Sequence, residues 1–340
     1  MAIDQAKGLK GALALLGKSE KTGLLIAFIL MVITFQIIKP GYISSANAIN
    51  ILVSMSIVGL VAIAQTYLMI SGVIDLSAGS VAAFSGVLAA LLLREGWPAP
   101  VAIIAVIAIG SLIGLMNATL INKLKFGFFI TTFGTMSIFR GLAYIICDGK
   151  AIFINNQTFN NIGVARIGIA GIFSIPLSIV IFLAMMLFFG IVLSRTKFGR
   201  RIFMLGGNPT AAHLAGINQE KLRTKLFMLS SSLAALGGIV LASRMNSGQP
   251  MASQGLEFDA ITAAVLGGVA LSGGIGSMGG CLIGLLIMQG FNYGLQFTNV
   301  QSFWQQVCKG LLLFAALAFD YLRKKQREKS LYEKTVRNSA

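Results

Sequence analysis

The sequence predicts an all-α integral membrane protein with about ten transmembrane helices and short broken or re-entrant segments between them. Of its 340 residues, 56% are hydrophobic and only 11% are charged, a composition outside the range of water-soluble domains. Apolar segments of about 20 residues, the length needed to cross about 30 Å of hydrocarbon, recur along the whole chain. The distribution of basic residues is the third observation.

Each predicted span is an apolar run bounded by polar or charged residues. The ten ranges are 23–38, 51–71, 76–93, 99–121, 128–146, 172–193, 226–242, 256–271, 277–295 and 303–322. The first run follows four lysines and ends without a small-residue cleavage pattern. We therefore expect it to be a retained span and not a cleaved signal peptide.

The net charge of +16 is concentrated in alternate loops. If the N-terminal segment 1–22 is cytoplasmic, 20 of the 27 Lys and Arg residues lie on the inner side, in that segment, at Lys123 and Lys125, in the 194–225 loop and in the 323–340 tail. Cytoplasmic loops carry such an excess. The bias predicts one transmembrane domain over 1–340 with both termini cytoplasmic, and it argues against nucleic acid as a partner.

Two glycine patterns imitate nucleotide-binding motifs. Gly274, Gly276 and Gly279 have the spacing of a dinucleotide fingerprint but lie between and within predicted membrane spans, without the strand that the motif requires. Gly11 precedes the Gly17–Lys18–Ser19 run by one residue too many for a phosphate-binding loop. The three cysteines lack metal-ligand spacing. We predict no catalytic residue, no metal site and no cofactor bound by this chain.

Small residues leading into the ninth span and within it recur every fourth residue. Ser272, Gly276, Gly280 and Gly284 would share one helical face, and small residues at this spacing let two membrane helices approach closely. We predict helix packing at Gly276, Gly280 and Gly284. The row from Ala78 to Ala90 has the same spacing.

Polar residues inside the spans are candidates for a translocation pathway, because they are costly in lipid. Asp75 in "SGVIDLSAGS" fits either a helix cap or direct contact with a solute. Arg140 needs a carboxylate or carbonyl partner, and Glu257 and Asp259 lie at a comparable depth. Neutral hydrogen-bonding groups suited to hydroxyl-rich solutes come from Gln65, Asn117, Gln289 and Asn292, and we expect most of them to join helices.

Residues 206–221 read as a short helix in the largest inner loop. Asn208 is a favourable N-cap, a proline follows it, and Gly216 suits the left-handed residue that ends a helix. A helix resting on lipid headgroups is the alternative to a helix that docks a protein.

The same loop resembles a known family. Gly207, Asn208, Ala211, Ala212, Gly216 and Ile217 match the coupling-loop pattern of carbohydrate-type ABC importer permeases, which include ribose, galactose, xylose and autoinducer-2 permeases. "DLSAGS", "TTFGTMSIFRG" and "EFDAITAAVLGGVALSGGIGSMGG" resemble that family's segments in the same order. The resemblance covers nearly the whole chain.

The resemblance implies a multi-pass permease of the bacterial inner membrane. Such a permease dimerises around a pathway with a second copy or a related permease, and it accepts sugar from an extracytoplasmic binding protein. It docks a separate ATPase subunit, which uses ATP and Mg. On this chain, the coupling residues would be those of the loop pattern, and Asp75, Ser77, Arg140, Gly141, Glu257 and Asp259 would belong to the membrane signatures.

Two other transport functions compete with a sugar importer. A branched-chain amino-acid ABC permease has a similar fold by the same resemblance. An ion-coupled carrier would place several ionisable groups at the membrane midplane, whereas the single histidine, His213, lies in the 194–225 loop. We therefore predict that energy comes from a partner subunit.

Overall fold

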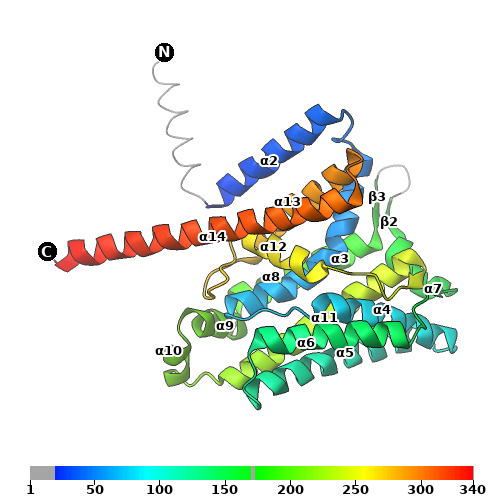
Figure 1. The fold of residues 1–340 in the computed structure, drawn as a ribbon, viewed down its shortest axis with the longest axis horizontal. Helices are drawn as coiled ribbons and strands as arrows, with labels where there is room; N and C mark the ends of the chain where they lie inside the picture. The colour runs from blue at the N-terminus through cyan, green and yellow to red at the C-terminus, as the bar shows by residue number, and fades with distance from the viewer. Residues whose placement is uncertain (1–19, 170–172, 340) are drawn as a thin grey trace.

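The computed structural model describes residues 20–169 and 173–339 and consists mainly of helices (Figure 1). Ten helices overlap the ten predicted spans: α2 (Glu20–Ile38), α3 (Ser45–Ile70), α4 (Ala78–Arg94), α5 (Ala99–Asn122), α6 (Phe128–Ile145), α8 (Leu177–Arg195), α11 (Gln219–Met245), α12 (Leu256–Leu266), α13 (Met278–Phe297) and α14 (Ser302–Ser339). Seven of them are long and apolar enough to cross a membrane.

The other three are shorter. α2 and α4 contain apolar stretches of at most 17 residues, and α12 has 11 residues, about 17 Å at 1.5 Å per residue. The structure thus supports a multi-pass protein. The count of ten spans and the cytoplasmic side for both termini stay predictions.

Short elements fill the connections. They are α7 (Gln157–Val164), α9 (Lys197–Gly207) and α10 (Pro209–Leu214), with the strands β1 (Ile152–Phe153), β2 (Arg166–Ile169), β3 (Phe173–Pro176) and β4 (Ser247–Gly248). β1 pairs antiparallel with β4, and β2 pairs with β3 in a hairpin. These short strands are confined to loops, and the described residues are otherwise mainly helical, as predicted.

The core lies around α3 and α11. α3 is buried continuously from Met55 to Ile70, and α11 packs against α3, α4 and α5. α13 packs against α2, α3 and α12. Large apolar side chains remain exposed on the outer helices, including Ile104, Leu187 and Phe314. In a membrane protein these side chains face lipid.

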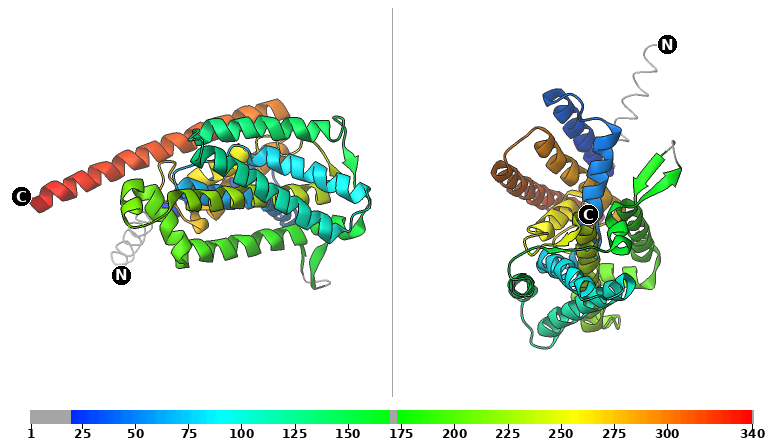
Figure 2. Two further views of the ribbon diagram at one scale, coloured as in Figure 1. Left: turned by 90° about the horizontal axis from the view of Figure 1, so that it is seen from below. Right: turned by 90° about the vertical axis from the view of Figure 1, so that its right-hand side faces the viewer.

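The two ends of the bundle differ. Figure 1 and Figure 2 show α10 and the projecting end of α14 together at one end, and α2 begins there. α7 and the β2–β3 hairpin lie at the opposite end. Residues 1–19, which hold the Gly11 to Ser19 pattern and most of the 1–22 segment, lie outside the described residues.

Two predicted boundaries are wrong for a shared reason. The 172–193 span begins only at Leu177, because β3 occupies the preceding residues and Pro176 stands at the N-cap of α8. The 256–271 span ends at Leu266, and the chain then forms a loop to the N-cap Ser277 of α13. Hydropathy is the same for an apolar helix and an apolar loop packed in protein, so it did not locate these ends.

That loop also corrects the predicted glycine row. Gly276 lies before α13, so it does not share a helical face with Gly280 and Gly284. The latter two do mediate close packing: a Cβ on Gly280 would overlap the carbonyl oxygen of Gly267, and one on Gly284 would overlap that of Ala263. α13 therefore approaches α12 with backbone against backbone.

Candidate functional site

A cavity of about 920 Å³ lies between α6, α12 and α14. We call it the α6–α12–α14 cavity. Its charged lining residues are Arg140, Glu257, Asp259 and Lys309, and its neutral polar ones are Ser137, Gln254, Thr262, Ser302, Gln305 and Gln306. Three of the predicted site residues therefore meet at one place.

Arg140 projects from α6 and binds backbone carbonyls. One terminal nitrogen, Nη1, donates to the carbonyl oxygens of Pro250 at 2.6 Å and Ala252 at 2.8 Å. The carbonyl partners that the sequence allowed are therefore present, and no direct ion pair joins Arg140 to Glu257 or Asp259 among the described residues, although the Glu257 carboxylate still interacts electrostatically with the guanidinium. Gly141 follows on α6, with no atom within 4 Å of the position a Cβ would take.

The two carboxylates differ in their partners, although both lie in the first turn of α12. Asp259 forms an ion pair with Lys309 of α14, with 3.0 Å between Oδ2 and Nζ. Glu257 is 4% exposed, and its Oε2 has no hydrogen-bond partner within the described part of the chain. The N-terminal end of a helix favours negative charge, so α12 stabilises both groups.

Asp75 anchors a network of hydrogen bonds inside the bundle. Its Oδ1 accepts from the Ser77 amide at 2.9 Å and the Ser77 hydroxyl at 2.5 Å, and its Oδ2 accepts from the Ser230 hydroxyl at 2.8 Å. The side chain is fully buried. Asp75 therefore organises the entry to α4, close to its predicted capping role.

The other predicted polar residues join the same network. Gln65 donates to the Asp75 carbonyl oxygen, Asn117 donates to the Ser77 hydroxyl at 3.1 Å, and the Thr135 hydroxyl donates to Asn117 at 2.6 Å. Gln65 and Asn117 thus join helices as expected, because the network connects α3, α4, α5, α6 and α11. Gln289 Nε2 and Asn292 Oδ1 of α13, by contrast, are buried without a hydrogen-bond partner in the described part of the chain. Sequence reasoning missed Thr135 and Ser230; the run of three serines at 230–232 in an apolar span was the available signal.

α10 has the predicted ends. The Asn208 side chain accepts from the Ala211 amide at 2.9 Å, Pro209 begins the helix, and Gly216 has φ +78°. Ala212 and Ile217 are buried against the bundle, whereas Leu214 is 83% exposed. The helix is held by one face and offers the other to a partner.

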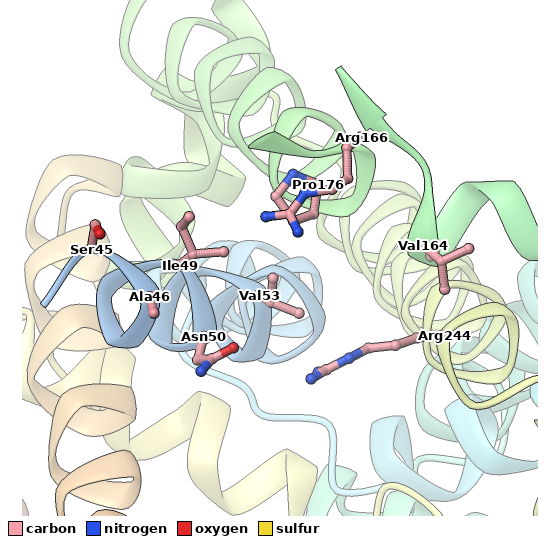
Figure 3. Close-up of a pocket in the computed structure, with 10 residues that line it drawn as sticks. Ser45, Ala46, Ile49, Asn50, Val53, Val164, Arg166, Pro176 and Arg244 are labelled. Carbon is pink, nitrogen blue, oxygen red and sulfur yellow. The ribbon is translucent and has the colours of Figure 1, made fainter. Parts of the chain in front are cut away.

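A second cavity, of about 620 Å³, lies at the end opposite α10. Figure 3 shows Arg166 and Arg244 reaching into it from β2 and α11, with Asn50 and Val53 of α3 on the facing wall. Its two cations would favour an acidic group.

The dinucleotide-like glycines are not a nucleotide site. Gly274 and Gly276 lie in the loop between α12 and α13, and Gly279 lies in α13. The element before that loop is a helix and not a strand. Over residues 20–169 and 173–339, no group of three His, Cys, Asp or Glu side chains is arranged to hold a metal ion.

The sequence matches one protein family over most of its length. The family is described as "Branched-chain amino acid transport system / permease component", and its model matches residues 47–317. The chain belongs to this permease family. The permease is 39% identical over 308 residues to the L-arabinose transport system permease protein AraH of Escherichia coli strain K12, covering 91% of this chain and 92% of that protein.

Other relatives carry names of other sugars. The ribose import permease protein RbsC of Bacillus subtilis strain 168 is 37% identical, covering 89% of this chain and 94% of that protein. The xylose transport system permease protein XylH of Haemophilus influenzae is 32% identical, covering 89% and 96%. No solved structure matches the permease with significance. The predictions of a non-enzymatic transport subunit and of a multi-pass protein in the inner membrane are confirmed.

Proposed function

We propose that this chain is the transmembrane permease subunit of a bacterial ABC importer for a monosaccharide or a related polyhydroxylated solute. The observation that carries the proposal is similarity over about nine-tenths of the chain to permeases named for arabinose, ribose and xylose. The family as a whole is named for branched-chain amino acids, so the choice of substrate rests on these relatives.

The lining of the α6–α12–α14 cavity suits a hydroxyl-rich solute. Two cations and two anions leave it without net charge, and glutamine, serine and threonine side chains offer both donors and acceptors. Met136, Phe258 and Leu313 complete the lining with apolar surface, so the choice of a sugar over an amino acid rests on the relatives. We assign this cavity to the translocation pathway, with Arg140, Glu257 and Asp259 in its wall. Gly141 follows Arg140 on α6, and the Gln65, Asp75, Ser77 and Asn117 network lies inside the bundle.

The partners follow from the two ends of the molecule. α10, with Gly207, Asn208, Ala211, Ala212, Gly216 and Ile217, is the docking helix for an ATPase subunit that binds ATP and Mg. The opposite end receives an extracytoplasmic sugar-binding protein. A second permease, identical or related, completes the pathway within the lipid membrane.

In this scheme the chain converts motion at α10 into a change of access. Closure of the two ATPase subunits displaces α10, and the helices continuous with it move the walls of the cavity. The permease itself supplies binding groups and moving helices, and all hydrolysis belongs to the partner.

Reconstitution of the permease with its ATPase and binding protein in proteoliposomes tests the proposal. We expect uptake of a radiolabelled pentose or hexose only when ATP and both partners are present. Uptake driven by a proton or sodium gradient with this chain alone would contradict it, and uptake of leucine but of no sugar would favour the branched-chain amino-acid alternative.

A variant of α10 sharpens the test. Leu214→Asp places a charge on the exposed docking face and should reduce co-purification of the ATPase. Leu124→Asp is the matched control, because Leu124 is also exposed and lies at the same end, beside the Lys125–Glu220 ion pair. We expect that control to retain the ATPase.

A further inference from the structure

The C-terminal end of α9, directly before α10, packs against two loops without any side chain between them. One loop follows α3, from Ser71 to Ser77, and the other joins α12 to α13. Figure 1 shows the second loop descending to α9 at the end of the molecule where α10 lies. We call the contact of Ile70, Gly72, Gly206, Gly273 and Gly274 the glycine junction.

Backbone atoms make every contact in the glycine junction. The Gly274 amide donates to the Ile70 carbonyl oxygen at 2.8 Å, which ties the two loops together. A Cβ on Gly206 would overlap that same carbonyl oxygen and lie 2.6 Å from the Gly274 nitrogen. A Cβ on Gly273 would lie 2.8 Å from the Gly206 carbonyl oxygen and 3.1 Å from the Gly72 Cα. Gly206 is therefore wedged between two backbones.

α9 is held firmly enough to act as one body with α10. Ile202 and Leu205 are fully buried, and the Thr196 side chain caps the helix by accepting from the Gly199 amide. Only Asn208 separates α9 from α10. Close-packed interiors transmit displacement because they have little space to absorb it.

Each loop that Gly206 touches leads to a part of the candidate site. The first loop reaches the Asp75 network within five residues of Ile70. The second connects α12, which carries Glu257 and Asp259 in the cavity wall, to α13. A shift at Gly206 therefore acts on both the network and the cavity.

We propose that Gly206 is a positioning residue that transmits movement of α10 to the loops 71–77 and 267–277, and so couples the ATPase to the pathway. This inference rests on the proposed function, since it requires an ATPase at α10. The close backbone contact is specific to Gly206. The adjacent Gly207 has no atom within 4 Å of the position that its Cβ would take. Gly206 is the position to test, and Gly134 of α6, which also has no atom within 4 Å of its Cβ position, provides the control.

The experiment compares Gly206→Ala with Gly134→Ala in the full complex. We expect Gly206→Ala to assemble with its ATPase and to hydrolyse ATP, while the solute transported per ATP falls about tenfold, within the usual range of coupling between distant sites. Gly134→Ala, on α6 and away from the glycine junction, should keep the wild-type ratio. Equal ratios in the two variants would overturn the proposal, and so would a parallel fall of hydrolysis and uptake in Gly206→Ala, which indicates structural damage.

A second variant, at Gly274 with φ +75°, covers a failure of Gly206→Ala to assemble. Gly274→Ala introduces a Cβ 2.8 Å from the Gly207 Cα on the other side of the contact, and it should lower the same ratio. If it leaves the ratio unchanged, or if neither variant assembles, the junction serves folding and the proposal is overturned. Wild-type uptake without an ATPase would instead refute the proposed function, a result independent of these variants.

Discussion

Arg140 illustrates how a single buried cation shapes this permease. A guanidinium placed in a membrane span needs acceptors, and the carbonyl groups of Pro250 and Ala252 supply them. The bonds connect α6 to the loop that leads into α12, where the cavity carboxylates lie. Arg140 therefore places a positive charge in the cavity and also connects α6 to the loop before α12 through its hydrogen bonds.

Replacing Arg140 by Met should disable transport. The variant loses two charge-assisted hydrogen bonds, each worth about 1.5–3 kcal/mol, and leaves two carbonyl groups without partners. We expect uptake in proteoliposomes to fall about tenfold or more and the purified protein to melt at a lower temperature. Gly134→Ala is the control on the same helix, because nothing lies within 4 Å of its Cβ position. Arg140→Met with unchanged uptake and assembly would exclude an essential role.

The sequence identified the polar residues better than their partners. Gln65, Asp75, Ser77 and Asn117 stand out because polar groups are rare in apolar spans, and the structure brings all four together. The partner of Arg140 was predicted from depth alone, which ranks Glu257 and Asp259 equally. Depth does not specify how helices rotate or how a loop folds back, and these decide that Asp259 meets Lys309.

Among the helices and strands, α10 was predicted most accurately because its ends are set by local chemistry. An asparagine cap, a proline in the first turn and a glycine after the last need no tertiary contact to favour this geometry. The β2–β3 hairpin and the loop after α12 lack such signals, and their apolar residues fit a helix equally well. Their structure depends on packing that hydropathy does not describe.

Gly216→Val should weaken the end of α10. Gly216 has φ +78°, in the left-handed region. This conformation destabilises a residue with an unbranched side chain by roughly 1 kcal/mol, and a β-branched residue by more. We expect co-purified ATPase and uptake to fall together, since the docking face is displaced. Gly216→Asn is the control, because asparagine tolerates the left-handed conformation and no atom lies within 4 Å of the Cβ position. Normal co-purification in Gly216→Val would contradict the placement of α10.

For the whole molecule, α11 defines the distance between the two functional ends. It begins at Gln219, five residues after α10 ends, and finishes at Met245 beside β4, which pairs with β1. Its 27 residues span about 40 Å at 1.5 Å per residue, more than the hydrocarbon thickness. Leu214 and Phe153 are therefore expected on opposite sides of the membrane, with Leu214 in the cytoplasm.

Cysteine labelling in whole cells tests this orientation. The native cysteines, Cys147, Cys281 and Cys308, are first replaced by Ala. The variants Leu214→Cys and Phe153→Cys are then compared in this background. Residues 214 and 153 are 83% and 82% exposed, so a difference in labelling does not come from side-chain exposure. A membrane-impermeant maleimide, added after the outer membrane is made permeable where one is present, should label residue 153 in intact cells and residue 214 only after lysis. The excess of basic residues near α10 supports this result, because such loops stay in the cytoplasm. Labelling of residue 214 in intact cells would place α10 outside, and no ATPase driven by cytoplasmic ATP would then reach it.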